Sequence, residues 1–85
     1  MKWQISITDR AKKMMRRVPK SDFRHIEEAI NEMAIDPFLG DLQKLGGGTQ
    51  TWRRRIGSYR IIFETSVQQK IIFITDIRRR ASNTY

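Results

Sequence analysis

The chain has 85 residues, with 17 Lys and Arg, 9 Asp and Glu, one histidine, no cysteine and a formal net charge of +8. This length suits one domain over residues 1–85, and the lack of cysteine excludes disulfide scaffolds, thiolate nucleophiles and cysteine metal sites. One histidine and scattered carboxylates also argue against a zinc site. No metal or other cofactor is expected.

The first predicted element is a half-buried strand, because Trp3, Ile5 and Ile7 alternate with polar residues. A helix is expected next, with Asp9 as its cap. The apolar stripe of this helix comprises Ala11, Met14, Met15 and Val18. Pro19 should end or interrupt the helix, because proline has no backbone N–H to donate.

A second helix is expected to start at Ser21 or Asp22 and to stop at Asp36, because the residue before Pro37 avoids helical backbone angles. Its broad apolar face is formed by Phe23, Ile26, Ala29, Ile30, Met33 and Ala34, with Glu27, Glu28 and Glu32 on the solvent side. His25 lies near the start of this amphipathic pattern and is interpreted as a surface or boundary residue.

Residues 38–50 are predicted to form a loop, with the three glycines at 46–48 as its flexible point. A phosphate-cradling role for these glycines is not favoured, because the lysine and hydroxyl residues of a P-loop do not follow them. A plain connecting loop is the expectation.

A β-hairpin is predicted over residues 51–63, because Gly57-Ser58 suits a two-residue turn with glycine first. The resulting register pairs Ile56 with Tyr59, Arg55 with Arg60, Arg54 with Ile61, Arg53 with Ile62, and Trp52 with Phe63. Successive side chains point to opposite faces of a strand. One face therefore carries Trp52, Ile56, Tyr59, Ile61 and Phe63, and the other carries Arg53, Arg55 and Arg60.

Three arginines on one sheet face are not required for folding, because opposed like charges destabilise a sheet by up to roughly 1 kcal/mol per pair. An anion over this face would explain them. The charge distribution agrees, since residues 41–85 carry 9 Lys and Arg against 3 Asp and Glu, whereas residues 1–40 carry 8 against 6. A basic patch of this strength indicates nucleic acid or another polyanion, and a solvated sheet surface is the alternative.

The last predicted strand covers residues 70–77, a nearly continuous apolar run that should be central and covered on both faces for much of its length. A basic tail of residues 78–85 follows. The order β-α-α-β-β-β predicts an α+β fold in which two N-terminal helices pack on one face of a small, mainly antiparallel sheet. No stretch resembles a signal peptide or a transmembrane segment, which favours a cytoplasmic location without a membrane partner.

The pattern Trp52-Arg53-x-Arg55-x-Gly57-x-Tyr59-Arg60-Ile61-x-Phe63 resembles the core motif of the RelE/ParE superfamily of bacterial toxins. The resemblance extends over nearly the whole chain. It includes the leading strand, the helical hairpin, the proline after the second helix, Lys44-Leu45-Gly46, and an arginine-rich end that closes on a tyrosine. It implies a RelE-like toxin of a type II toxin–antitoxin system.

In the RelE-like branch, the resemblance implies a catalytic set of Arg55, Arg60, Arg79 and Tyr85, with alignment freedom across Arg78 to Arg80. It implies RNA- or phosphate-binding roles for Arg53, Lys44, Arg78 and Arg80. The implied activity is metal-independent cleavage of mRNA in the ribosomal A site, in which the ribose 2′-oxygen attacks the adjacent phosphate. Guanidinium groups suit the charge that develops on the phosphate, and a tyrosine can stack on a base.

The implied partners are a cognate antitoxin protein, mRNA and the ribosome with its rRNA, and operator DNA bound through the antitoxin. Two alternatives remain open. A ParE-like inhibitor of DNA gyrase would not need Arg55, Arg60, Arg79 and Tyr85 as a unit. A non-enzymatic module could use the same basic patch to bind nucleic acid.

The sequence departs from the family pattern in two ways. Arg53 and Arg55 stand where some members have lysine, and arginine hardly acts as a general base. The chain therefore supplies charge stabilisation more convincingly than a base. Arg54 stands where the family usually has an apolar residue, so it should lie at the sheet margin with its head in solvent, or the register should shift by one residue.

Overall fold

The computed structural model describes residues 2–46 and 50–79. Its elements, in chain order, are β1 (Gln4–Ile7), α1 (Asp9–Arg16), α2 (Lys20–Ile35), β2 (Asp41–Leu45), β3 (Thr51–Ile56), β4 (Tyr59–Ser66) and β5 (Ile71–Arg79). The predicted α+β class, with both helices ahead of the hairpin, is confirmed. Neither described helix is long and apolar enough to cross a membrane.

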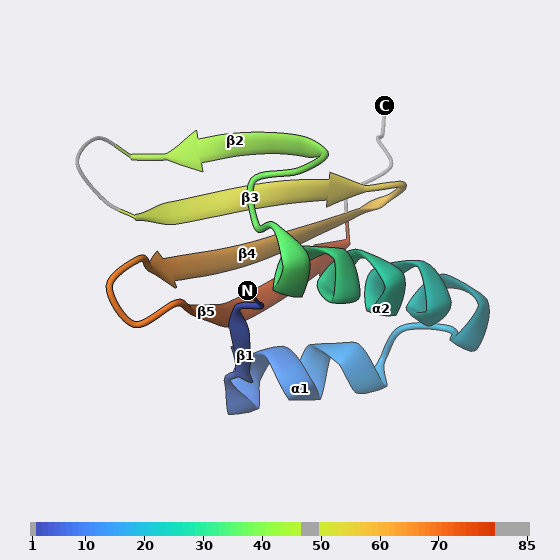
Figure 1. Ribbon diagram of the computed structural model, residues 1–85. Helices are drawn as coiled ribbons and strands as arrows, with labels where there is room; N and C mark the ends of the chain where they lie inside the picture. Colours follow the sequence, from blue (N-terminus) through green and yellow to red (C-terminus); the bar gives the residue numbers. More distant parts are fainter. Residues whose placement is uncertain (1, 47–49, 80–85) are drawn as a thin grey trace.

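A five-stranded sheet in the order β1-β5-β4-β3-β2 forms one layer of the molecule. Strands β2, β3, β4 and β5 pair antiparallel with their neighbours, and β1 pairs parallel with β5. Both helices lie on one side of this sheet (Figure 1). The other side carries no helix among the described residues. The sheet is therefore mainly antiparallel, as predicted, with one face left for other uses.

The two helices begin and end at residues whose chemistry explains the boundaries. Thr8 caps α1, because its hydroxyl oxygen accepts a hydrogen bond from the backbone N–H of Ala11 at 3.2 Å. The predicted cap, Asp9, is instead the first helical residue, where its charge suits the positive helix end. Pro19 occupies the N-cap position of α2, and Asp36 follows its last residue. Proline thus separates the helices as expected.

Strand β2 was not predicted, because residues 38–50 show no alternation of apolar and polar side chains. Only Leu42 and Leu45 in β2 are half-buried, and its three other residues are exposed. The strand forms because its backbone pairs with β3 in a register that sets Leu42 opposite Arg54. An edge strand needs little burial when a long neighbour offers free hydrogen-bonding groups. Two of the three loop glycines, Gly47 and Gly48, lie outside the described residues.

The core lies between the two helices and the inner face of the sheet. Its fully buried members include Ile26 and Met33 from α2, and Ile61, Phe63, Ile72, Ile74 and Ile77 from β4 and β5. Strand β5 lies inside the sheet, as predicted, but its two faces differ in how deeply their side chains are buried. Ile72 and Ile74 are buried, whereas Ile71 and Phe73 on the opposite face are only half-buried. The helices cover one face alone.

Arg54 is buried on the helix side of β3, which corrects both expectations for this residue. The hairpin register is unshifted, and only 5% of Arg54 is exposed, so its head does not reach into solvent. Its guanidinium donates a hydrogen bond to the Glu32 carboxylate and another, at 3.4 Å, to the carbonyl oxygen of Ala29. An arginine is stable at this core position because α2 supplies both a counter-charge and an acceptor.

Gly40 packs directly against this buried arginine. A Cβ atom at position 40 would lie 2.8 Å from Nε of Arg54, closer than side chains tolerate, and the φ angle of +85° is in the region that favours glycine. The turn into β2 therefore requires a glycine for two independent reasons. Arg54 of β3 thus contacts both α2 and the turn between α2 and β2.

Removing Glu32 should destabilise the protein, because the guanidinium of Arg54 would stay buried without its counter-charge. We expect Glu32→Ala to lower the free energy of unfolding by about 2 kcal/mol in urea titrations, less than for a fully buried pair because the Glu32 side chain is 57% exposed. Glu27→Ala, which removes an exposed carboxylate from the same helix, is the matched control. In the Arg54→Met background, Glu32→Ala should have almost no effect; an undiminished loss there would contradict the pairing.

Candidate functional site

The hairpin between β3 and β4 has the predicted register at all five predicted positions, from Ile56 opposite Tyr59 to Trp52 opposite Phe63. Gly57 has a φ angle of +54°, and Ser58 is not in the left-handed region. This combination is typical of a two-residue turn with glycine first, whose twist matches that of the flanking strands. The turn therefore places every side chain of the hairpin on its predicted face.

Three arginines from three adjacent strands form one row on the sheet face opposite the helices. Arg55 of β3 lies opposite Arg60 of β4, and Arg60 lies opposite Arg78 of β5. We call Arg55, Arg60 and Arg78 the arginine row. Neighbouring strands lie about 4.8 Å apart. A single phosphate group could therefore contact two members of the row at once.

Two donors in the arginine row lack acceptors. The Nε atoms of Arg55 and Arg60 are buried and have no hydrogen-bond partner among residues 2–46 and 50–79. A buried donor without an acceptor destabilises the fold by about 1–3 kcal/mol, and more when it is charged. An anion above the row would supply acceptors to both arginines, which is the property expected of an anion-binding site.

Acidic residues lie next to the two ends of the row. Asp41 of β2 is opposite Arg55, and its carboxylate is 3.6 Å from Nε of that arginine. At the other end, Nε of Arg78 donates to the carboxylate of Asp76 at 2.8 Å. Arg60, in the middle, has no carboxylate opposite it on either neighbouring strand. The least compensated positive charge therefore lies at the centre of the row.

Arg78, and not Arg79, shares the sheet face of Arg55 and Arg60. Arg79 lies opposite Tyr59 on the helix side, with its guanidinium carbon 5.9 Å from the centre of the tyrosine ring. The family resemblance implies the catalytic role for Arg79, with alignment freedom across residues 78–80. Strand alternation resolves the position of these two side chains, whereas Arg80 lies outside the described residues.

The remaining predicted site residues are distributed differently. Arg53 shares the face of the row and donates a hydrogen bond to the Gln43 side chain. Lys44 lies opposite Trp52 on the helix side, with its ammonium 5.6 Å from the indole ring, so the structure does not bring it to the row. Tyr85 lies outside the described residues.

No group of three or more His, Cys, Asp or Glu side chains is placed to hold a metal ion in the described part of the chain. His25 is exposed on α2, 3.9 Å from the Glu28 carboxylate, which fits its interpretation as a surface residue. The residues gathered at the arginine row are instead suited to bind and stabilise a negatively charged group.

Residues 5–84 match the family described as the ParE toxin of the type II toxin–antitoxin system parDE. The chain belongs to this toxin family. It is 29% identical over 83 residues to a protein described as a candidate RelE1 toxin of Methanocaldococcus jannaschii, covering 94% of this chain and 92% of that one. It is thus a RelE-like member of the RelE/ParE superfamily.

Solved structures agree with this assignment. The toxin matches a chain of the archaeal RelE–RelB complex from Pyrococcus horikoshii with a TM-score of 0.86 and 26% identity, over 98% of this chain and 100% of that one. It also matches the isolated E. coli RelE toxin with a TM-score of 0.82 and 14% identity, over 95% and 87% of the two chains. The second likeness concerns the fold alone.

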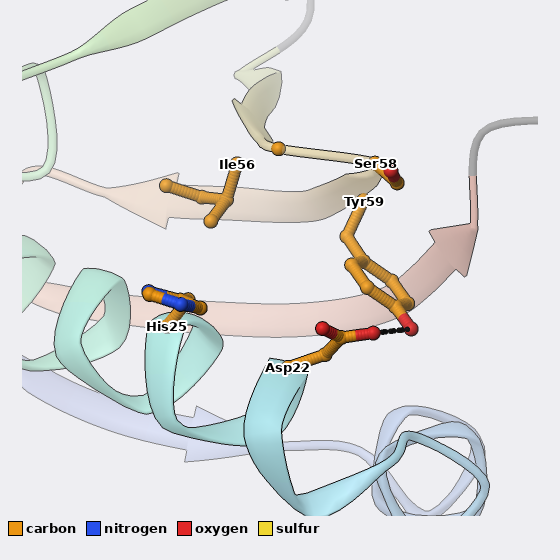
Figure 2. Close-up of a pocket in the computed structure, with 6 residues that line it drawn as sticks. Asp22, His25, Ile56, Ser58 and Tyr59 are labelled. Atoms are coloured by element: carbon orange, nitrogen blue, oxygen red, sulfur yellow. Dashed lines mark hydrogen bonds between the residues drawn. The ribbon is translucent and has the colours of Figure 1, made fainter.

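A hollow of about 320 Å³ lies on the helix side of the toxin, beside the hairpin turn (Figure 2). It is lined by Asp22 and His25 of α2 and by Ile56, Gly57, Ser58 and Tyr59 of the hairpin. The Tyr59 hydroxyl donates a hydrogen bond to the Asp22 carboxylate at 2.9 Å, and Tyr59 itself is 6% exposed. This contact joins the start of α2 to the hairpin that carries Arg55 and Arg60.

The Tyr59 hydroxyl is held in its neutral form. Burial raises the pKa of Tyr59, and the hydrogen bond to the Asp22 carboxylate raises it further, while the positive charge of Arg79 acts in the opposite direction. In the unfolded chain a tyrosine titrates at about pH 10. The neutral, hydrogen-bonded form is therefore favoured by folding.

This shift predicts a pH dependence of stability that Tyr59→Phe should remove. Below about pH 10 the hydroxyl is neutral in both states, so its contribution is fully present, about 1–2 kcal/mol for a bond to a carboxylate. As the pH rises further, the unfolded chain ionises first and the contribution falls. The difference in unfolding free energy between parent and variant should therefore shrink from pH 8 to pH 11. A constant difference would contradict the shifted titration.

Proposed function

We propose that this toxin is an mRNA endonuclease that cleaves its substrate in the ribosomal A site without a metal ion. The arginine row is the observation that supports this proposal most directly. It gathers positive charge on the sheet face opposite the helices, and two of its members have buried donors that find no acceptor within the described residues. A long single-stranded polyanion could lie across such a face.

The proposed reaction is attack by a ribose 2′-oxygen on the adjacent phosphate, with departure of the 5′-oxygen of the next nucleotide. The products are a 2′,3′-cyclic phosphate and a 5′-hydroxyl. Negative charge grows on the phosphate oxygens as the new bond forms. Arg55 and Arg60, opposite each other in the register, would hold those oxygens from two sides. One such donor is worth roughly 2.7–4 kcal/mol in the transition state by analogy with oxyanion holes.

Three other residues have proposed roles at this site. Arg78 would extend phosphate binding to the next strand, in place of the role first expected for Arg79. Arg53, beside the row, would contact the RNA backbone. Tyr85 is proposed to stack on a base of the substrate, because stacking requires only an aromatic ring near the bound strand.

Alanine variants test the proposed roles within the row. Arg55→Ala and Arg60→Ala should each slow single-turnover cleavage of ribosome-bound mRNA by about 10²–10³, while RNA binding weakens much less. Arg78→Ala should slow it more than Arg79→Ala, since only Arg78 shares the face of the row. The melting temperature of Arg60→Ala should hold or rise, because this change removes like-charge contacts and Arg60 has no carboxylate opposite it on either neighbouring strand.

The exposed Arg16 of α1, on the opposite side of the sheet, provides the matched loss of one positive charge. Arg16→Ala should cleave at the parental rate. If Arg60→Ala folds and also cleaves at that rate, the nuclease proposal fails. A supercoiling assay with DNA gyrase should then be run, because the matched family is described as a ParE toxin.

We also propose that a cognate antitoxin protein binds this toxin and carries it to operator DNA. The solved relatives include RelE–RelB complexes from Pyrococcus horikoshii and Methanococcus jannaschii. In the present chain, a groove of about 430 Å³ on the helix side offers a docking place. Its lining combines Ile7, Met15, Val18 and Phe23 with three cations, Lys12, Arg16 and Lys20. We call it the helix-side groove.

The occupant that fits the helix-side groove is an amphipathic segment with acidic residues beside its apolar ones. Apolar side chains would fill the floor, and carboxylates would meet the exposed cations at the rim. A second copy of the toxin fits poorly, because each copy has a net charge of +8. Charge complementarity therefore favours an acidic protein segment, and the antitoxin is the proposed source.

Charge reversal at the rim should weaken antitoxin binding. We expect the double variant Lys12→Glu/Arg16→Glu to raise the dissociation constant for the cognate antitoxin at least tenfold in calorimetric titrations, about 1.4 kcal/mol. The double variant Lys13→Glu/Arg17→Glu makes the same change in charge at exposed residues of the same region that do not line the groove. Equal losses in the two variants would mean that only net charge matters and that the groove is not the docking place.

A further inference from the structure

The arginine row leaves one step of the proposed reaction without a residue. A 2′-hydroxyl that attacks phosphorus must lose its proton, and arginine does not accept protons in proteins. A positioned acceptor typically contributes 10²–10⁴-fold to the rate of such a step. The acceptor should lie beside the phosphate that Arg55 and Arg60 hold, and it should be open to the substrate.

Asp41 meets both requirements. The register extends the arginine row by one strand, so that Asp41, Arg55 and Arg60 lie side by side on β2, β3 and β4. The Asp41 carboxylate is 3.6 Å from Nε of Arg55, and its side chain is 63% exposed. One strand spacing of about 4.8 Å separates Asp41 from Arg55, and about one and a half spacings, roughly 7 Å, separate its strand from a phosphate held between Arg55 and Arg60. That distance suits a group acting on the ribose next to the phosphate.

Other carboxylates on this face are poorly suited to the role. Asp76 is 6% exposed, and its oxygens already accept hydrogen bonds from the backbone N–H of Ile77 and from Nε of Arg78. Glu64 is exposed, but it lies four residues beyond Arg60 on β4, about 13 Å away. In the part of the chain that the structure describes, Asp41 is the exposed carboxylate next to the row.

We propose that the Asp41 carboxylate is the general base of this toxin, an inference that rests on the nuclease function proposed above. Asp41 takes the proton from the 2′-hydroxyl while the 2′-oxygen forms its bond to phosphorus. The bond from phosphorus to the 5′-oxygen breaks, and the leaving oxygen takes a proton from solvent water. Arg55 and Arg60 neutralise the phosphate during this exchange, and Asp41 afterwards returns its proton to solvent.

Asp41→Asn tests this assignment, because the amide keeps the shape of the side chain and loses its basicity. In single-turnover cleavage of ribosome-bound mRNA, we expect a loss of about 10²-fold or more with little change in RNA affinity, and substantial activity in Asp41→Glu. Glu64→Gln, the matched removal of an exposed carboxylate from the same sheet face, should cleave at the parental rate. Parental activity in Asp41→Asn would overturn the assignment.

A double-mutant cycle separates a base from a residue that merely holds Arg55. In the Arg55→Ala background, Asp41→Asn should still slow cleavage at least tenfold, because proton transfer does not pass through the arginine. No further loss there would overturn the base assignment and make Asp41 a positioning residue for Arg55.

The parental toxin provides a separate test of the underlying nuclease proposal. It should cut the normal mRNA and fail to cut an mRNA with 2′-deoxyribose at the cleaved nucleotide. If it cuts neither, the nuclease proposal fails and Asp41 loses its proposed role with it. If it cuts the normal mRNA and Asp41→Asn does so equally well, the nuclease proposal stands and the base assignment fails.

Discussion

The register of the β3–β4 hairpin is the constraint on which the rest of this structure depends. Arg53, Arg54 and Arg55 are consecutive, so a slip of one residue would exchange buried and exposed guanidinium groups while leaving an arginine at two of these three positions. The turn at Gly57 and the apolar neighbours Trp52 and Ile56 prevent that slip. The local composition of β3 alone cannot distinguish the two possible pairing registers of the hairpin. A turn that requires glycine at its first position does distinguish them, because it fixes which residues are paired.

The three consecutive arginines consequently do different physical work. Arg54 points toward the helices, where its two terminal nitrogens donate to Glu32 and to a backbone carbonyl of α2, its Nε has no partner among the described residues, and Gly40 makes room for it. Its neighbours point to the other face, where they lack such internal acceptors or find them only at the edge strand. Arg54 therefore links the sheet to the helices, whereas Arg53 and Arg55 remain available to an external anion. The side-chain alternation of a strand is sufficient to create this division.

Much of the fold could be predicted from sequence because its signals are local. The alternation in β1, the helical spacing of α1 and α2, the prolines and the two-residue turn each act over a few residues. The arginines of the hairpin could be assigned to faces for the same reason. Three features depended on distant partners and could not be predicted in this way: strand β2, the burial of Arg54, and the choice between Arg78 and Arg79.

Each of these three features is decided by a neighbour that is remote in sequence. Strand β2 exists because β3 offers it a ladder of hydrogen bonds, although its own side chains show no strand pattern. Arg54 is buried because Glu32 lies 22 residues earlier on the facing helix. Strand β5 has one extra residue between the pairs Ile62–Asp76 and Phe63–Ile74, which shifts the register there. This shift helps to determine which arginine of the tail lies opposite Arg60. Apolar patterning does not report such pairings.

The placement of the groove and the arginine row on opposite sides of the sheet has a consequence for the length of any inhibitor that uses both. A chain that leaves the groove beside Ile7 of β1 and runs over the neighbouring edge of the sheet crosses β5 to reach Arg60. Sheet thickness and strand spacing make that path about 25 Å, or about eight extended residues. A shorter ligand could occupy the groove while leaving the charged face open. Binding to the groove and inhibition at the arginine row would then be separate properties. The length of the bound chain, rather than its affinity for the groove, would decide whether it also inhibits the toxin.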